Sequence, residues 1–145
     1  MRRAFSLVEL IVAVAVIGII ATAGGLRFSH ALQHHRASLS AEILRSSFEE
    51  AKATARQQNA PVTFTFVQNA STYTITGMDN PDKPGRPYVV NLDVIAPGAK
   101  LSANATVTIN SYGYITADRT LELNVSSVKK YLQLNRNQNS VTITN

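Results

Sequence analysis

The chain has 145 residues, a formal net charge of +5 and no cysteine. A chain of this length holds one small domain with a modest core. The absence of cysteine excludes disulfides, and three histidines without a nucleophile motif argue against an enzyme. We therefore predict a non-enzymatic protein that needs no cofactor.

Residues 5–26 form an almost continuous apolar segment behind a basic leader. Arg2 and Arg3 precede the segment, and Glu9 is its one charged residue. As a helix rising about 1.5 Å per residue, it would be about 33 Å long, enough to cross the hydrocarbon core of a bilayer. We therefore predict a transmembrane helix over residues 5–26, with both arginines cytoplasmic and the rest of the chain outside. A charge inside a membrane costs about 3 kcal/mol or more, so Glu9 is a candidate functional residue.

The helical pattern is predicted to continue through an amphipathic half, residues 27–59, and to end before Pro61. Glu49 and Lys52 have the i,i+3 spacing of a weak ion pair. Small and apolar residues recur every three or four positions and form one stripe, which consists of Ala37, Ala41, Leu44, Phe48, Ala51 and Ala55. We expect one long helix whose second half packs on a globular domain.

Residues 60–145 change from a helical to an alternating apolar period, which predicts a β-rich globular domain. Its first strands are predicted to form a hairpin that packs on the Phe48 face of the helix. The last strands are predicted to form an antiparallel meander that includes Tyr112 and Tyr114. The predicted fold class is therefore α+β: a long N-terminal helix, transmembrane in its first half, packed on a small antiparallel β-sheet domain.

The beginning of the chain resembles the class III signal of type IV prepilins and type II secretion pseudopilins. Ala4, where Gly is usual, is followed by the string FSLVE, so that Glu9 is the fifth residue counted from Phe5. The resemblance implies that residues 1–4 are a leader, that a prepilin peptidase cuts between Ala4 and Phe5, and that Phe5 is N-methylated. It also implies that Glu9 pairs with the amino terminus of a neighbouring subunit in a filament. The alternative is a secretory signal peptide, cut within residues 21–25.

The order of parts resembles the GspH/FimT-type minor pseudopilins, in which a long helix is followed by a Val-rich strand and a final hairpin. The stretches that carry the resemblance are ARQQNAPVTFTF, TVTINSYGYITADRTLELN and KKYLQLNRNQNSVTIT. They imply a minor pilin or pseudopilin, a structural subunit that primes or caps a type II secretion pseudopilus or a type IV pilus. Its partners would be other pilins, the prepilin peptidase and the inner-membrane assembly platform. It would be a single-pass protein of the bacterial inner membrane with a periplasmic C-terminal domain, incorporated in a periplasmic or extracellular filament.

The alternative function is DNA capture for natural transformation, as in some FimT-like minor pilins. Phosphate contact needs clustered cations, and the candidates are Lys129, Lys130, Arg136 and Arg119. Strand alternation would send Lys129 and Lys130 to opposite faces, and residues 138–140 stand where many members carry a Gly-Arg turn. The sequence leaves open the pilus, secretion and DNA-binding versions, and a position at the tip or in the shaft.

Two groups of side chains have the composition of metal ligands. His30 and His34 are one helical turn apart, and Asp79, Asn80 and Asp82 place three oxygen-bearing side chains in four residues. We interpret the histidines, with the adjacent His35, as a solvated or interfacial face and the acidic group as ordinary turn chemistry. We predict no metal site.

Overall fold

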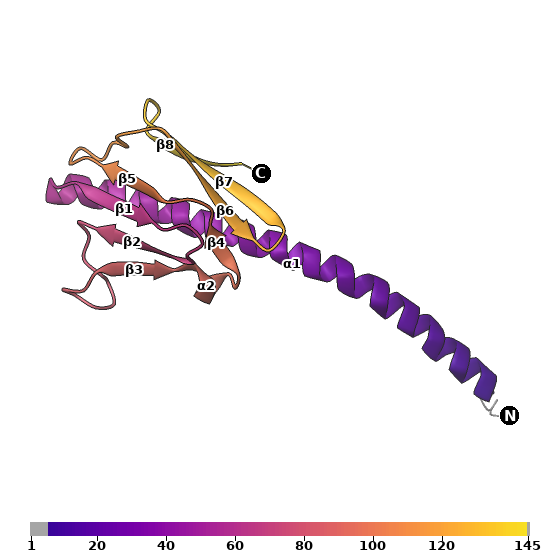
Figure 1. The fold of residues 1–145 in the computed structure, drawn as a ribbon. Coiled ribbons are helices and arrows are strands. Elements are labelled where there is room, and N and C mark those ends of the chain that lie inside the picture. Colours follow the sequence, from indigo (N-terminus) through magenta and orange to yellow (C-terminus); the bar gives the residue numbers. More distant parts are fainter. Residues whose placement is uncertain (1–5, 145) are drawn as a thin grey trace. The chain divides into compact units, whose positions relative to one another are not determined.

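The computed structural model describes residues 6–144 (Figure 1), with the backbone alone for residues 21–27. The chain divides into two compact units, residues 1–32 and 33–145. From Leu7 onward the described part of the first unit is helical. The elements in chain order are α1 (Leu7–Gln58), β1 (Val62–Phe66), β2 (Thr72–Thr76), β3 (Tyr88–Asn91), α2 (Leu92–Ile95), β4 (Ala99–Leu101), β5 (Ala105–Ile109), β6 (Arg119–Val125), β7 (Val128–Asn135) and β8 (Ser140–Thr144).

The second unit contains two four-stranded antiparallel sheets, ordered β3-β2-β1-β5 and β4-β6-β7-β8. The prediction of antiparallel strands is confirmed, and β6, β7 and β8 pair in chain order as the expected meander. The prediction is wrong for the first part of the meander, residues 107–114. β5 pairs with β1, where Val107 lies opposite Phe64, and so belongs to the first sheet. Tyr112 and Tyr114 lie outside every strand. The pairing of β5 with β1 is favoured because Val107 and Ile109 extend the buried apolar face on which Phe64 lies.

The part of α1 in the second unit forms one wall of the core (Figure 1). Each residue of the predicted stripe is 0% exposed: Ala37, Ala41, Leu44, Phe48, Ala51 and Ala55. Phe48 stacks on Phe64 of β1 with ring centroids 4.2 Å apart, and Phe66 and Tyr73 extend this aromatic cluster. The predicted packing of the helix on antiparallel strands, with the first hairpin on the Phe48 face, is confirmed.

The sequence predicts a membrane crossing over residues 5–26. Within residues 6–144, as far as the structure describes them, no helix combines the length and the apolar character that a membrane crossing needs. Phe5 and the side chains of residues 21–27 lie outside the description. The membrane crossing therefore stays a prediction.

The Tyr73 hydroxyl is buried in the core and bonded to the helix. The Ser47 hydroxyl donates to the Ile43 carbonyl oxygen at 3.0 Å, so Tyr73 donates to Ser47 Oγ across 2.8 Å. Burial raises the pKa of Tyr73 to about 12, against the smaller opposing effect of the Ser47 hydrogen bond. The neutral hydroxyl is therefore the form that the folded chain holds.

We expect the free energy of unfolding to fall as the pH rises above 10. An unfolded tyrosine loses its proton near pH 10, whereas folded Tyr73 keeps its proton to about pH 12. The folded state therefore binds more protons in this window, and a rising pH favours unfolding by up to roughly 2–3 kcal/mol. Urea titrations across the window measure the slope. Tyr73→Phe should make the fall of the free energy of unfolding with pH shallower. The part that remains comes from Tyr88, whose pKa is also raised by burial. The control Tyr112→Phe, at an exposed site, should leave the slope unchanged. Equal slopes in wild type and Tyr73→Phe would contradict this assignment.

Candidate functional site

Glu9 lies in the first turn of α1. Its backbone N–H donates to the Ser6 carbonyl oxygen at 3.0 Å, and a carboxylate at this end of a helix is favoured by the helix dipole. The Glu9 carboxylate is exposed, and none of the ion pairs formed within residues 6–144 involves it. Ala4 and Phe5, the predicted cleavage and methylation site, lie outside the described residues.

Residues 7–20 of α1 expose apolar side chains all round the helix. The exposed fractions run from 49% to 74% at Leu7, Val8, Leu10, Ile11, Val12, Val14, Val16, Ile17, Ile19 and Ile20. At about 100° per residue these positions cover every face rather than one stripe. A helix of this kind is stable when other apolar groups surround it, as lipid or packed helices do. This segment is therefore a candidate contact surface.

The strand register divides the four cations predicted for DNA contact into two pairs. Lys129 pairs with Asn124 close to the turn between β6 and β7, whereas Arg119 pairs with Leu134 near the other end of β7. Positions 129 and 134 are five residues apart, which is about 17 Å along a strand. Lys129 is exposed on the outer face, and Lys130 lies on the opposite, core-facing side, as strand alternation predicts.

Acidic groups also compensate part of this positive charge. Lys129 Nζ lies 2.8 Å from Glu122 Oε1, and this pair raises the pKa of the lysine and lowers that of the carboxyl. At the other end of β7, the Arg136 backbone N–H donates to Asp118 Oδ1 at 2.6 Å, which fixes a carboxylate beside Arg119 in the chain. The four cations are thus not gathered on one face, and DNA binding stays a prediction.

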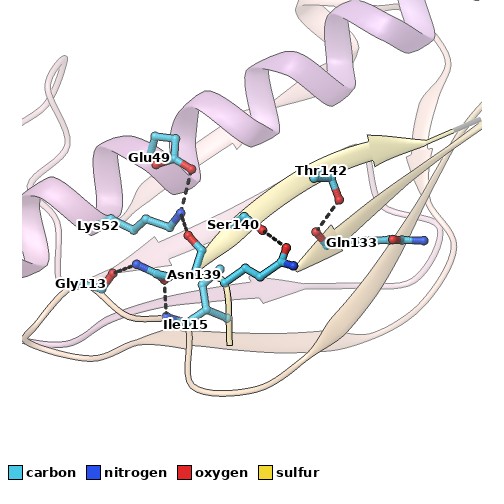
Figure 2. Close-up of polar contacts among 9 residues, drawn as sticks. Glu49, Lys52, Gly113, Ile115, Gln133, Asn139, Ser140 and Thr142 are labelled. Carbon is cyan, nitrogen blue, oxygen red and sulfur yellow. Dashed lines mark hydrogen bonds and ion pairs between the residues drawn. The ribbon is translucent and has the colours of Figure 1, made fainter. Parts of the chain in front are cut away.

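A buried lysine, which the sequence analysis did not identify as buried, joins α1 to the turn between β7 and β8 (Figure 2). Lys52 is 5% exposed, and its Nζ donates to Glu49 Oε1 at 2.7 Å and to the Asn139 carbonyl oxygen at 2.9 Å. The Asn139 amide then donates to the Gly113 carbonyl oxygen and accepts from the Ile115 N–H, both at 3.0 Å. Three segments far apart in the chain therefore meet at Asn139.

The predicted ion pair of Glu49 and Lys52 is present, but it is more than a weak surface pair. Lys52 lies one turn after Phe48 and three residues before Ala55, so it continues the buried stripe of the helix. That spacing is the signal by which its burial could have been found.

Neither candidate group of metal ligands gathers enough donors. Across the described part of the chain, no group of three or more His, Cys, Asp or Glu residues is placed to hold a metal ion. Asn80 accepts from the backbone N–H groups of Asp82 and Lys83, each at 3.0 Å, and donates to the Pro87 carbonyl oxygen at 3.2 Å. Its amide is thus occupied in organising a turn.

Three comparisons with known proteins bear on this arrangement. Residues 1–25 match the family model described as the prokaryotic N-terminal methylation motif. No curated protein matches the chain. The fold matches the type IV minor pilin FimU of Pseudomonas aeruginosa in two crystal forms. One has 13% identity and a TM-score of 0.57, with 77% of this chain and 90% of that chain covered. The other has 12% identity and a TM-score of 0.53, with 74% and 92% covered.

At such identities the likeness to FimU shows a shared fold. The methylation motif is independent of that likeness, because it rests on residues 1–25, where the sequence places the junction of Ala4 and Phe5. The chain thus combines the prokaryotic N-terminal methylation motif with a fold like that of a type IV minor pilin.

Proposed function

We propose that the protein is a minor pilin, processed by a prepilin peptidase and built into a type IV pilus that it primes or caps. One observation carries the proposal: a helix that exposes apolar residues on every face, with an exposed carboxylate at Glu9, lies within and directly behind a methylation motif. The pilus is preferred to a secretion pseudopilus because FimU, the protein whose two crystal forms match this fold, is a type IV minor pilin.

In this proposal the first unit of each subunit waits in the inner membrane and then packs against its neighbours in the filament. Arg2 and Arg3 stay cytoplasmic until the leader is removed, and the second unit faces the periplasm. The methylated amino terminus of Phe5 would then pair with Glu9 of an adjacent subunit. Leaving either charge unpaired among apolar side chains costs several kcal/mol, so the pairing favours one axial register.

We expect co-expression with a prepilin peptidase to remove residues 1–4 and to add one methyl group to Phe5. Intact-mass spectrometry of the purified chain measures both changes. Ala4→Leu should block cleavage, because a small residue at the junction is replaced by a bulky one. A chain that keeps its leader beside an active peptidase and a processed control pilin would contradict the proposal.

Glu9→Gln removes the carboxylate and keeps the shape of the side chain. The variant should be cleaved but lost from sheared pili by tenfold or more, since an unpaired buried charge costs roughly 1.4 kcal/mol or more. Glu9→Asp, which keeps the charge, is the matched control and should be retained better. Wild-type incorporation of Glu9→Gln would exclude the pairing.

A further inference from the structure

The outer face of the sheet formed by β4, β6, β7 and β8 carries a polar groove of about 370 Å³. Its floor is one cross-strand row, in which Gln133 of β7 lies opposite Thr120 on one side and Thr142 on the other. Asp118, Arg119 and Gln138 line its rim. Figure 2 shows Gln133 and Thr142 side by side on their neighbouring strands.

The groove is held in shape by bonds from its own side chains. The Asp118 carboxylate accepts from the Arg136 N–H at 2.6 Å, and the Asn135 side chain accepts from the Gln138 N–H at 3.0 Å. The Thr142 hydroxyl donates to the Gln133 carbonyl oxygen at 3.5 Å. These contacts fix the rim and the floor before any ligand arrives, which reduces the entropy lost on binding.

Three polar side chains in the groove remain available to a ligand. The Thr120 hydroxyl and the Gln133 amide are exposed on the floor, and Arg119 is exposed at the rim. Within residues 6–144 none of these three side chains forms a hydrogen bond or an ion pair. Tyr131 lies two residues before Gln133 on the same face and is partly buried. An aromatic side chain thus lies on this face of β7 next to the lining residues of the groove.

The chemistry of this lining selects a neutral, hydroxyl-rich ligand. One carboxylate, Asp118, and one guanidinium, Arg119, cancel in charge, and the other polar side chains are amides and hydroxyls that both donate and accept. Adjacent hydroxyls of a sugar ring also donate and accept, and the apolar face of the ring can stack on an aromatic side chain such as Tyr131. A nucleic acid would meet one cation beside a fixed carboxylate, which suits phosphate poorly.

We propose that this groove is a binding site for a neutral saccharide. Its volume of about 370 Å³ is at the lower end of the range of small-molecule sites, which suits a short oligosaccharide. A peptide strand could not pair with the floor, because β7 already has β6 and β8 as its two neighbours. Side-chain contacts must therefore carry recognition.

The test uses the full chain in a zwitterionic detergent, since a detergent with a sugar headgroup would compete. We expect binding on an array of neutral glucose, galactose, mannose and N-acetylglucosamine oligosaccharides, followed by titration with the sugar that binds. The double variant Arg119→Ala/Gln133→Ala should weaken binding by roughly tenfold or more, and Thr120→Val should weaken it less. The matched control Arg86→Ala/Gln57→Ala changes the same residue types at exposed sites outside the groove and should leave the affinity unchanged.

The array also separates two sources of such a ligand: N-acetylglucosamine oligomers stand for the cell wall, and the others for exported or foreign polysaccharides. Absence of binding across the array would overturn the proposal. So would binding that the groove variants leave unchanged. A titration with duplex and single-stranded DNA completes the test, because DNA binding that is lost in Arg119→Ala/Gln133→Ala would assign the groove to nucleic acid instead.

Discussion

Replacing Phe48 by alanine is expected to lower the free energy of unfolding by about 3–5 kcal/mol, the usual cost of deleting a buried aromatic ring. Phe48 is 0% exposed, and its ring centroid lies 4.2 Å from that of Phe64 and 6.3 Å from that of Phe66. The loss is large because a helix and a paired strand enclose the ring and cannot collapse into the space. A domain of this size has about 5–15 kcal/mol of stability in total, so the variant is close to unfolding.

Urea unfolding followed by the tyrosine signal measures this loss. Leu39→Ala, on the same helix at a site that is 39% exposed, is the control and should change stability by less than about 1 kcal/mol. A similar change for both variants would mean that Phe48 does not join the helix to β1. The two variants are compared only if their unfolding curves have the same dependence on urea concentration, m, because an equal m means that unfolding exposes the same amount of surface.

Replacing Asn139 by alanine is expected to cost about 2–4 kcal/mol, from two separate causes. Asn139 has a φ of 48°, a left-handed conformation that alanine adopts reluctantly. The substitution also removes the side-chain bonds to the Gly113 carbonyl oxygen and the Ile115 N–H. Both backbone groups are partly buried, so each loses a partner that water replaces only in part.

Asn139→Gly separates the two causes. Glycine tolerates the left-handed φ but cannot make the side-chain bonds, so it should recover roughly 1 kcal/mol of the loss. Hydrogen exchange at the Ile115 amide should accelerate in both variants, because both lack its acceptor. Protection at Ile115 equal to that of the wild type would show that Asn139 does not hold this loop.

The helix and its buried stripe could be predicted because helical burial follows from a local period. Strand partners could not, since alternation gives a strand an apolar face without naming its neighbour, and Val107 fits β1 as well as it fits β6. Tyr112 and Tyr114 also alternate with other residues in the sequence, but this alternation does not come from a strand. The Asn110 side chain accepts from both backbone N–H groups, and Gly113 between them has a φ of 76°, so the segment is a turn.

The candidate sites also divide into features that are local in the sequence and features that depend on the folded chain. The methylation motif is a contiguous string, which the sequence alone supplies. The separation of Lys129 from Arg119 depends on the register of β6 and β7, and no spacing within one strand contains it. Lys52 likewise binds Asn139, 87 residues later, and only the folded chain brings the two together.

α1 changes character along its length: up to Ile20 its large apolar side chains are exposed, whereas from Ala37 onward it buries one narrow stripe in its own domain. The stretch that we propose to meet other subunits and the stretch that supports the sheets thus share no side chains. Substitutions in one stretch can accumulate without altering the other. In the filament that we propose, the β-sheet domain would therefore be free to diverge while the helical end stays compatible with other subunits, so that the same anchor could carry different surfaces.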